Sequence, residues 1–197
     1  MKTQALRDSL SQYPDEAIDS FIEYHKINGG LSRFKKFKYF FEEILCLEDY
    51  QEKYQEALQT FSSISMSRLQ RAPLMPGIQT ILSALHERGL PTIIASGAAQ
   101  DDLQLIIQAL QMDKFFQYIG GSPDSKTQIV NKFLQQMPHT NVRGLFFGDA
   151  LSDYEAAKKL NFTFIFISGD SEWAESEVFL SSKRATIIEN FYDIEIR

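Results

Sequence analysis

The sequence predicts an α/β protein, in which an all-helical N-terminal region is followed by a parallel sheet flanked by helices. Through residues 1–72, apolar residues recur at three- and four-residue spacing, and no strand pattern is visible. The pattern changes after Arg71, where Pro73 and Pro76 interrupt the chain and short apolar strands begin to alternate with helices. We therefore expect a helical domain over residues 1–72 and an α/β domain over residues 73–197.

The helical domain is expected to be a small antiparallel bundle. Pro14 opens its first main helix, and Asn28-Gly29-Gly30 closes it, because asparagine and glycine tolerate the backbone geometry that ends helices. Ser32 can cap the next helix, and a third helical segment covers roughly residues 49–69.

A local basic cluster surrounds the start of the second helix and contains Arg33, Lys35, Lys36 and Lys38. In a chain with a net charge of −6, such a cluster could face an anionic substrate. A solvated face of an amphipathic helix is the favoured interpretation.

The α/β domain is expected to alternate strands and helices along its length. The strands are predicted at residues 92–95, 118–120, 145–147, 162–167 and 186–188, and the helices at residues 78–88, 99–111, 125–136 and 154–160. Residues 168–183 carry no pattern that predicts either.

Composition limits the classes of partner. The net charge of −6 argues against nucleic acid as an obligatory partner, because phosphate backbones are bound by a positive field. Cys46 is the only cysteine, which excludes an internal disulfide, and its apolar neighbours predict a buried small side chain. His25, His86 and His139 lack metal-ligand spacing, which favours structural or exposed positions. With no apolar run of ~20 residues and no apolar signal core, we expect a cytoplasmic protein without a membrane partner.

Two carboxylates follow the most apolar predicted strand. Residues 144–148 end in glycine, and Asp149 and Asp153 come next, four residues apart, where a helix begins. Open α/β sheets bind ligands at the carboxyl ends of their strands, and Mg²⁺ prefers a few hard oxygen ligands with retained waters. The spacing therefore indicates an Mg²⁺ site. The alternative is that Asp149 caps the helix and Asp153 merely decorates its first turn.

Two further strand ends carry polar groups. Ser96-Gly97 follows the strand at residues 92–95 and offers a hydroxyl and an accessible backbone to an anion, although the same pair also suits an ordinary helix cap. Ser125 is a predicted N-cap, which places Lys126 in the first turn of the next helix. A cation there opposes the helix dipole, so neutralising a bound phosphate or a carboxylate cluster would explain it.

The order of these groups resembles the haloacid dehalogenase superfamily of phosphatases. Residues 93–97 look like its second motif, Lys126 like its third, and Gly148-Asp149 with Asp153 like its fourth, while residues 1–72 look like its helical cap. The resemblance implies Mg²⁺-dependent hydrolysis of a phosphomonoester. Ser96 would then bind phosphoryl oxygens, Lys126 would neutralise charge, and Asp149 and Asp153 would hold the metal.

The chain departs from this family at its front. The family opens with an apolar strand ending in Asp-x-Asp, which supplies the nucleophile and the general acid and base, and this sequence contains no Asp-x-Asp. The resemblance places that strand between the strands predicted here at residues 92–95 and 145–147, so two inner edges would be left unpaired. A shortened sequence is the favoured explanation; a neighbouring element filling the position, or closure of the sheet, are the alternatives.

Two functional classes follow. The first is a phosphatase for a small phosphorylated metabolite, such as a sugar phosphate, whose chain is inactive as written because covalent transfer needs an attacking carboxylate. The second is a non-catalytic phosphate- or metal-binding or regulatory protein. A dehalogenase is disfavoured, because that reaction does not call for the metal pair. In the expected cap, Gly29-Gly30 and Arg33 are the candidates for contact with substrate. The pattern predicts no particular oligomeric state.

Overall fold

The computed structural model describes residues 2–29, 31–138, 142–173, 175–183 and 185–194. The chain divides into two compact units, a helical unit (residues 1–72) and an α/β unit (residues 73–197). All strand pairings in the α/β unit are parallel, which confirms the predicted fold class. No described helix is long and apolar enough to cross a membrane.

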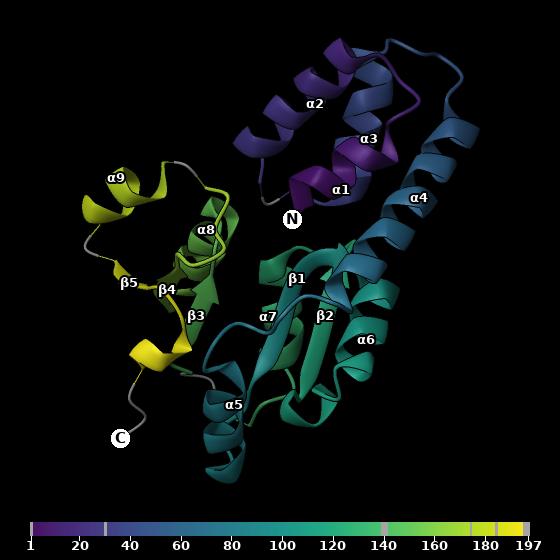
Figure 1. Ribbon diagram of the computed structural model, residues 1–197. Coiled ribbons are helices and arrows are strands. Elements are labelled where there is room, and N and C mark those ends of the chain that lie inside the picture. The colour runs from purple at the N-terminus through teal and green to yellow at the C-terminus, as the bar shows by residue number, and fades with distance from the viewer. Residues whose placement is uncertain (1, 30, 139–141, 174, 184, 195–197) are drawn as a thin grey trace. The chain divides into compact units, whose positions relative to one another are not determined.

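The helical unit consists of short helices and one long one (Figure 1). They are α1 (Lys2–Ser9), α2 (Asp15–Ile27), α3 (Arg33–Tyr39), the π-helical turn η1 (Phe40–Ile44) and α4 (Gln51–Leu69). Ser32 occupies the N-cap of α3 as predicted, although its side chain makes no capping hydrogen bond. The described residues of this unit contain no strand.

An aromatic core holds the helical unit together. Phe21, Phe37, Phe40 and Phe41 are all fully buried. The ring of Phe21 packs against Phe37 and Phe40 with centroids 5.6 and 5.1 Å apart. Tilted and edge-on contacts of this kind stabilise the unit beyond the simple burial of apolar area.

One prediction for the helical unit is wrong, and the prediction of a solvated basic face holds for Lys35 and Lys38 but is wrong for Lys36. Cys46 is exposed, because it follows η1 with a positive φ of 50° that turns it out of the apolar run. Lys36 is not on a solvated face but is only 4% exposed. Its Nζ lies 2.7 Å from Nδ1 of the buried His25 and donates to the carbonyl of Gly29 at 3.3 Å. His86 is exposed, and His139 lies outside the described residues.

The α/β unit alternates strands and helices as expected. Its elements are α5 (Ile78–Glu87), β1 (Ile93–Ala99), α6 (Gln100–Ala109), η2 (Asp113–Phe115), β2 (Tyr118–Ser122), α7 (Lys126–Leu134), β3 (Leu145–Gly148), α8 (Leu151–Leu160), β4 (Thr163–Ile167), α9 (Ser176–Ser181), β5 (Thr186–Ile188) and η3 (Phe191–Asp193). Helix α9 lies in the stretch for which the sequence predicted nothing.

The strands form two separate parallel sheets. β1 pairs with β2, and β3 pairs with β4, which in turn pairs with β5 (Figure 1). β1 and β3 do not pair with each other, and no described strand pairs with both. Within the described residues, the sheet has therefore neither closed up nor gained a strand from elsewhere in the chain. Among the described strands, β1 and β3 therefore each keep the unpaired inner edge that the sequence predicted.

One hydrophobic cluster nevertheless spans both sheets. It joins Ile93 and Ala95 of β1 to Phe146 of β3 and Val130 of α7. Ile94, which lies between Ile93 and Ala95 in the strand, belongs to a different cluster with Leu82 of α5 and Leu103 of α6. Side chains on successive residues of a strand point to opposite faces, so helices cover both faces of β1.

Candidate functional site

Lys126 and Asp153 form the centre of the candidate site. Ser125 caps α7 by accepting the amide of Gln128 in a capping box, which confirms the predicted cap. Nζ of Lys126, in the first turn, forms a close ion pair with Oδ1 of Asp153 and donates to Oγ of Ser152 at 3.2 Å. The two side chains of the pair are only 16% and 6% exposed. The carboxylate of Asp153 therefore offsets the unfavourable position of the Lys126 ammonium group at the start of a helix.

Asp153 folds back over the loop that precedes α8. The amide of Ala150 donates to Oδ2 of Asp153 at 3.1 Å. Gly148 is required beneath it, because a Cβ at this position would collide with the Asp153 side chain. With a residue exposure of 4%, Asp153 does more than decorate an exposed first turn.

Asp149 lies between the end of β3 and the start of α8. Ala150, not Asp149, is the N-cap of α8, so the capping role considered for Asp149 is wrong. Asp149 is half-buried, and its backbone carbonyl accepts a hydrogen bond of 2.6 Å from Oγ of Ser171. Sequence reasoning missed Ser171, because it lies 22 residues away in a loop without periodicity.

Ser96 and Gly97 lie inside an irregular part of β1. The pairing with β2 shifts between Ala95 and Ala99, and Oγ of Ser96 accepts the amide of Ala98 at 3.1 Å within this interval. The strand therefore continues past the predicted end, and α6 begins at Gln100. The hydroxyl of Ser96 thus helps to hold the irregular segment of β1 in which it lies, three residues before the end of the strand.

Gln100 ties the ends of β1 and β2 together. Its Oε1 accepts the amide of Gly121 at 2.6 Å, and its Nε2 donates to the carbonyl of Ile119 at 3.0 Å. The sequence pattern did not single out this residue, because a glutamine at a helix start carries no recognisable signal. Its side chain therefore connects the start of α6, which follows Ser96 and Gly97, to β2.

Arg33 is engaged within the helical unit. Its Nη1 donates to Oγ of Ser62 on α4 at 2.7 Å, and its guanidinium stacks over the rings of Phe34 and Phe61 at 5.2 and 5.9 Å. These contacts join α3 to α4 and give Arg33 a structural role. Its contact with substrate stays a prediction.

The chemistry of the donors fits a hard cation. In the part of the chain that the structure describes, no group of three or more His, Cys, Asp or Glu side chains is placed to hold a metal. Asp149 and Asp153 supply two carboxylates, and Mg²⁺ needs only one or two when it keeps its waters. Both oxygens of Asp153 already accept a hydrogen bond, but each carboxylate oxygen has a second lone pair.

The fold and these side chains define a class of protein: an open parallel α/β protein with polar and charged side chains near the carboxyl ends of its strands, where folds of this class bind their ligands. The chain belongs to the haloacid dehalogenase-like hydrolase family, whose model matches residues 2–167. The comparison with curated proteins found no match.

Solved structures of haloacid dehalogenase (HAD) hydrolases share this fold. A family IA, variant 3 HAD hydrolase from Entamoeba histolytica is 16% identical with a TM-score of 0.73, covering 99% of this chain and 88% of the other. A predicted phosphatase from Clostridium acetobutylicum is 17% identical with a TM-score of 0.67, covering 97% and 87%. A HAD hydrolase from Bacillus subtilis bound to magnesium is 13% identical with a TM-score of 0.65, covering 98% and 88%.

Proposed function

We propose that this hydrolase-family chain forms the phosphate and Mg²⁺ site of a phosphomonoester phosphatase that acts on a small phosphorylated metabolite. The observation that carries the proposal is the buried pair of Lys126 and Asp153, at the start of the helix that follows β3, with Asp149 directly after the last residue of that strand. A lysine paired with a buried carboxylate, with a second carboxylate four residues earlier in the chain, suits a site that balances the charges of a phosphate and a divalent cation. The match of the family model to residues 2–167 supports it.

Each residue has a distinct task in this proposal. The hydroxyl of Ser96 and the backbone at Gly97 bind phosphoryl oxygens, and the ammonium of Lys126 offsets their negative charge. Asp149 and Asp153 hold Mg²⁺, which supplies Lewis-acid stabilisation of charge on the phosphoryl group when bound. In the helical unit, Arg33 is the candidate for contact with the rest of the substrate.

We further propose that residues 1–197 alone do not turn over substrate. The sequence contains no Asp-x-Asp, and in the described structure β1 and β3 leave facing edges without a strand between them. Covalent phosphoryl transfer needs an attacking carboxylate, and the residues assigned above can only position the phosphate and offset its charge.

The test is hydrolysis of p-nitrophenyl phosphate with Mg²⁺. Residues 1–197 are expected to show the background rate, whereas a protein extended upstream by an apolar strand with Asp-x-Asp is expected to turn over. In the extended protein, Lys126→Ala and Asp149→Ala are each expected to abolish turnover. Lys132→Ala is the control, because this lysine of the same helix pairs with Asp124 instead. Metal-dependent turnover by residues 1–197 that survives Asp149→Ala would refute the assigned site.

The lack of an Asp-x-Asp also favours a second candidate, a non-catalytic protein that binds phosphate or a metal ion for regulation. Isothermal titration of residues 1–197 with Mg²⁺ and with inorganic phosphate, compared with Asp149→Asn, measures binding without turnover. An extended protein that folds and binds Mg²⁺ but stays inactive would support this candidate over the phosphatase.

A further inference from the structure

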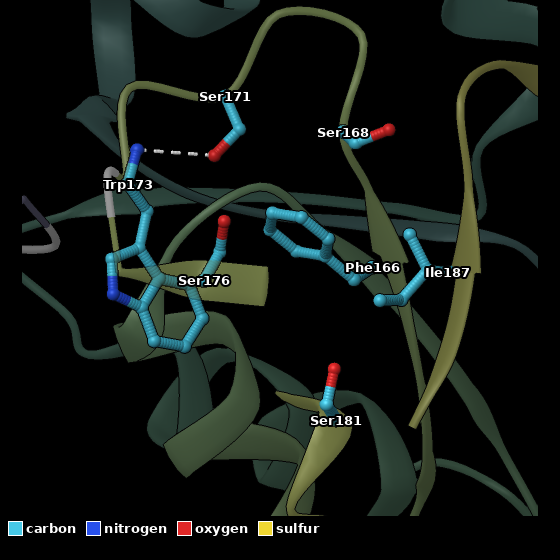
Figure 2. Close-up of a pocket in the computed structure, with 7 residues that line it drawn as sticks. All are labelled: Phe166, Ser168, Ser171, Trp173, Ser176, Ser181 and Ile187. Carbon is cyan, nitrogen blue, oxygen red and sulfur yellow. Dashed lines mark hydrogen bonds between the residues drawn. The ribbon is translucent and has the colours of Figure 1, made fainter. Parts of the chain in front are cut away.

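Ser171 joins the loop after β4 to the loop that carries Asp149. Its Oγ donates to the backbone carbonyl of Asp149 at 2.6 Å and accepts the amide of Trp173 at 3.1 Å. Figure 2 shows the contact with Trp173 beside an open pocket of about 460 Å³. Both hydrogen-bonding functions of the hydroxyl are thus in use, and its direction is fixed.

The loop around Ser171 is itself anchored at both ends. The amide of Ser168 donates to the carbonyl of Ile188 at 2.9 Å, and its hydroxyl donates to the same carbonyl at 3.2 Å. On the other side, the ring of Trp173 packs edge-on against Phe166 of β4 and tilted against Phe179 of α9, at 5.8 and 5.3 Å. Ser171 therefore connects Asp149 to a loop that is anchored on both sides.

Asp149 depends on this support, because it lies between two regular elements. β3 ends at Gly148, and α8 begins at Leu151 with Ala150 as its cap, so Asp149 lies outside both regular elements. The pocket beside Ser171 leaves its loop with an open side, so hydrogen bonds rather than close packing must orient it. Fixing the carbonyl of a residue also restricts the direction in which its side chain leaves the backbone.

We propose that Ser171 is a positioning residue that orients the Asp149 carboxylate for Mg²⁺. This inference rests on the proposed function, in which Asp149 is a metal ligand. Mg²⁺ demands near-ideal octahedral geometry, and loss of a partner that orients a ligand typically lowers metal affinity about 10- to 100-fold. Because Ser171 acts through the backbone, a loss of about 10-fold is expected.

Isothermal titration of the full chain with Mg²⁺ tests the proposal. Ser171→Ala is expected to bind about 10-fold more weakly than the parent, and Ser171→Thr, which keeps the hydroxyl, is expected to bind like the parent. Ser182→Ala is the matched control, since Oγ of Ser182 makes the same kind of bond, to the carbonyl of Phe179 at 2.6 Å, away from Asp149. Parent-like binding by Ser171→Ala would overturn the proposal.

Hydrogen exchange without metal separates this inference from the proposed function. Ser171→Ala is expected to speed exchange of the amides at residues 149–152, while Ser182→Ala leaves them unchanged. If neither the parent nor any variant binds Mg²⁺, the metal assignment fails. Faster exchange in Ser171→Ala, without a change in Ser182→Ala, would still support the positioning role of Ser171. Unchanged exchange in a folded Ser171→Ala protein overturns that role whatever the metal result.

Discussion

The helical unit and the α/β unit complete their structures in different ways. In the helical unit, four phenylalanines are fully buried, whereas residues 93–98 of β1 are only half-buried and Leu145 of β3 is 61% exposed. A helix satisfies its backbone hydrogen bonds internally and needs only packing. A strand needs a neighbour at each edge. β1 and β3, whose facing edges do not pair, are therefore less completely buried than the phenylalanine core of the helical unit.

The candidate site lies in the α/β unit, on and directly after the strands with unpaired edges. Ser96 lies within β1, and Asp149 and Asp153 follow β3, so the site residues belong to the strands with unpaired edges. Hydrogen bonds outside the regular helix and sheet pairing hold them in place: Ala98 to Ser96, Ala150 to Asp153 and Ser171 to Asp149. The site is thus organised by its loops and caps, which makes it sensitive to single polar substitutions.

The largest expected effect is on core packing. Phe40→Ala in the helical unit should lower the free energy of unfolding by about 3–5 kcal/mol, because it empties a fully buried position. Phe147→Ala in β3 removes the same atoms from a half-buried position beside Phe191 and should cost about 1–2 kcal/mol. Urea denaturation followed by circular dichroism measures both, and equal losses would contradict the contrast between the units.

The second-largest effect is expected for the buried ion pair of Lys126 and Asp153. Lys126→Met should lower the free energy of unfolding by about 2–3 kcal/mol, because it leaves the buried carboxylate of Asp153 without its cation. Lys132→Met, which breaks the more exposed pair with Asp124, should cost under about 1 kcal/mol. Adding Asp153→Leu to Lys126→Met should recover part of the loss. A double variant less stable than Lys126→Met would show that Asp153 acts through other partners.

A smaller effect distinguishes two serine caps. Ser125→Ala should cost about 1 kcal/mol, because the side chain of Ser125 accepts the amide of Gln128 at the start of α7. Ser32→Ala at the start of α3 should have almost no effect, since its side chain makes no capping bond. Thermal unfolding compares them. Equal destabilisation would mean that the cap geometry in one of the two units is misassigned.

The smallest effect, in the helical unit, is the loss at high pH of one contribution to stability. The hydrogen bond from Tyr50 to Glu42 raises the pKa of Tyr50 to about 12, with burial and the Glu42 charge adding to the shift. A raised tyrosine pKa stabilises the folded state below pH 10, and this contribution is lost between pH 10 and 12. Absorbance at ultraviolet wavelengths should show a late-titrating tyrosine that Glu42→Gln returns toward 10. A parent titration without a late component would refute this contact.

Features encoded within a few residues could be predicted. The alternation of apolar strands and helices predicted the parallel α/β fold class, and β5 lies where the pattern placed it. The cap at Ser125 was predicted because a serine directly before a helical pattern is a local signal, whereas its capping box with Gln128 was found only in the structure. Helix α9 was missed, since its six residues are too few to show periodicity.

The sequence by itself thus determined the fold class, the alternation of strands and helices apart from α9, and the position of Asp149 directly after a strand. Only the tertiary structure decided that Lys126 meets Asp153, that Lys36 is buried against His25, and that Ser171 holds Asp149. Helical periodicity and caps depend on neighbours within one or two turns. Contacts between residues 11 to 27 positions apart depend on how the chain returns in space, which no local pattern records.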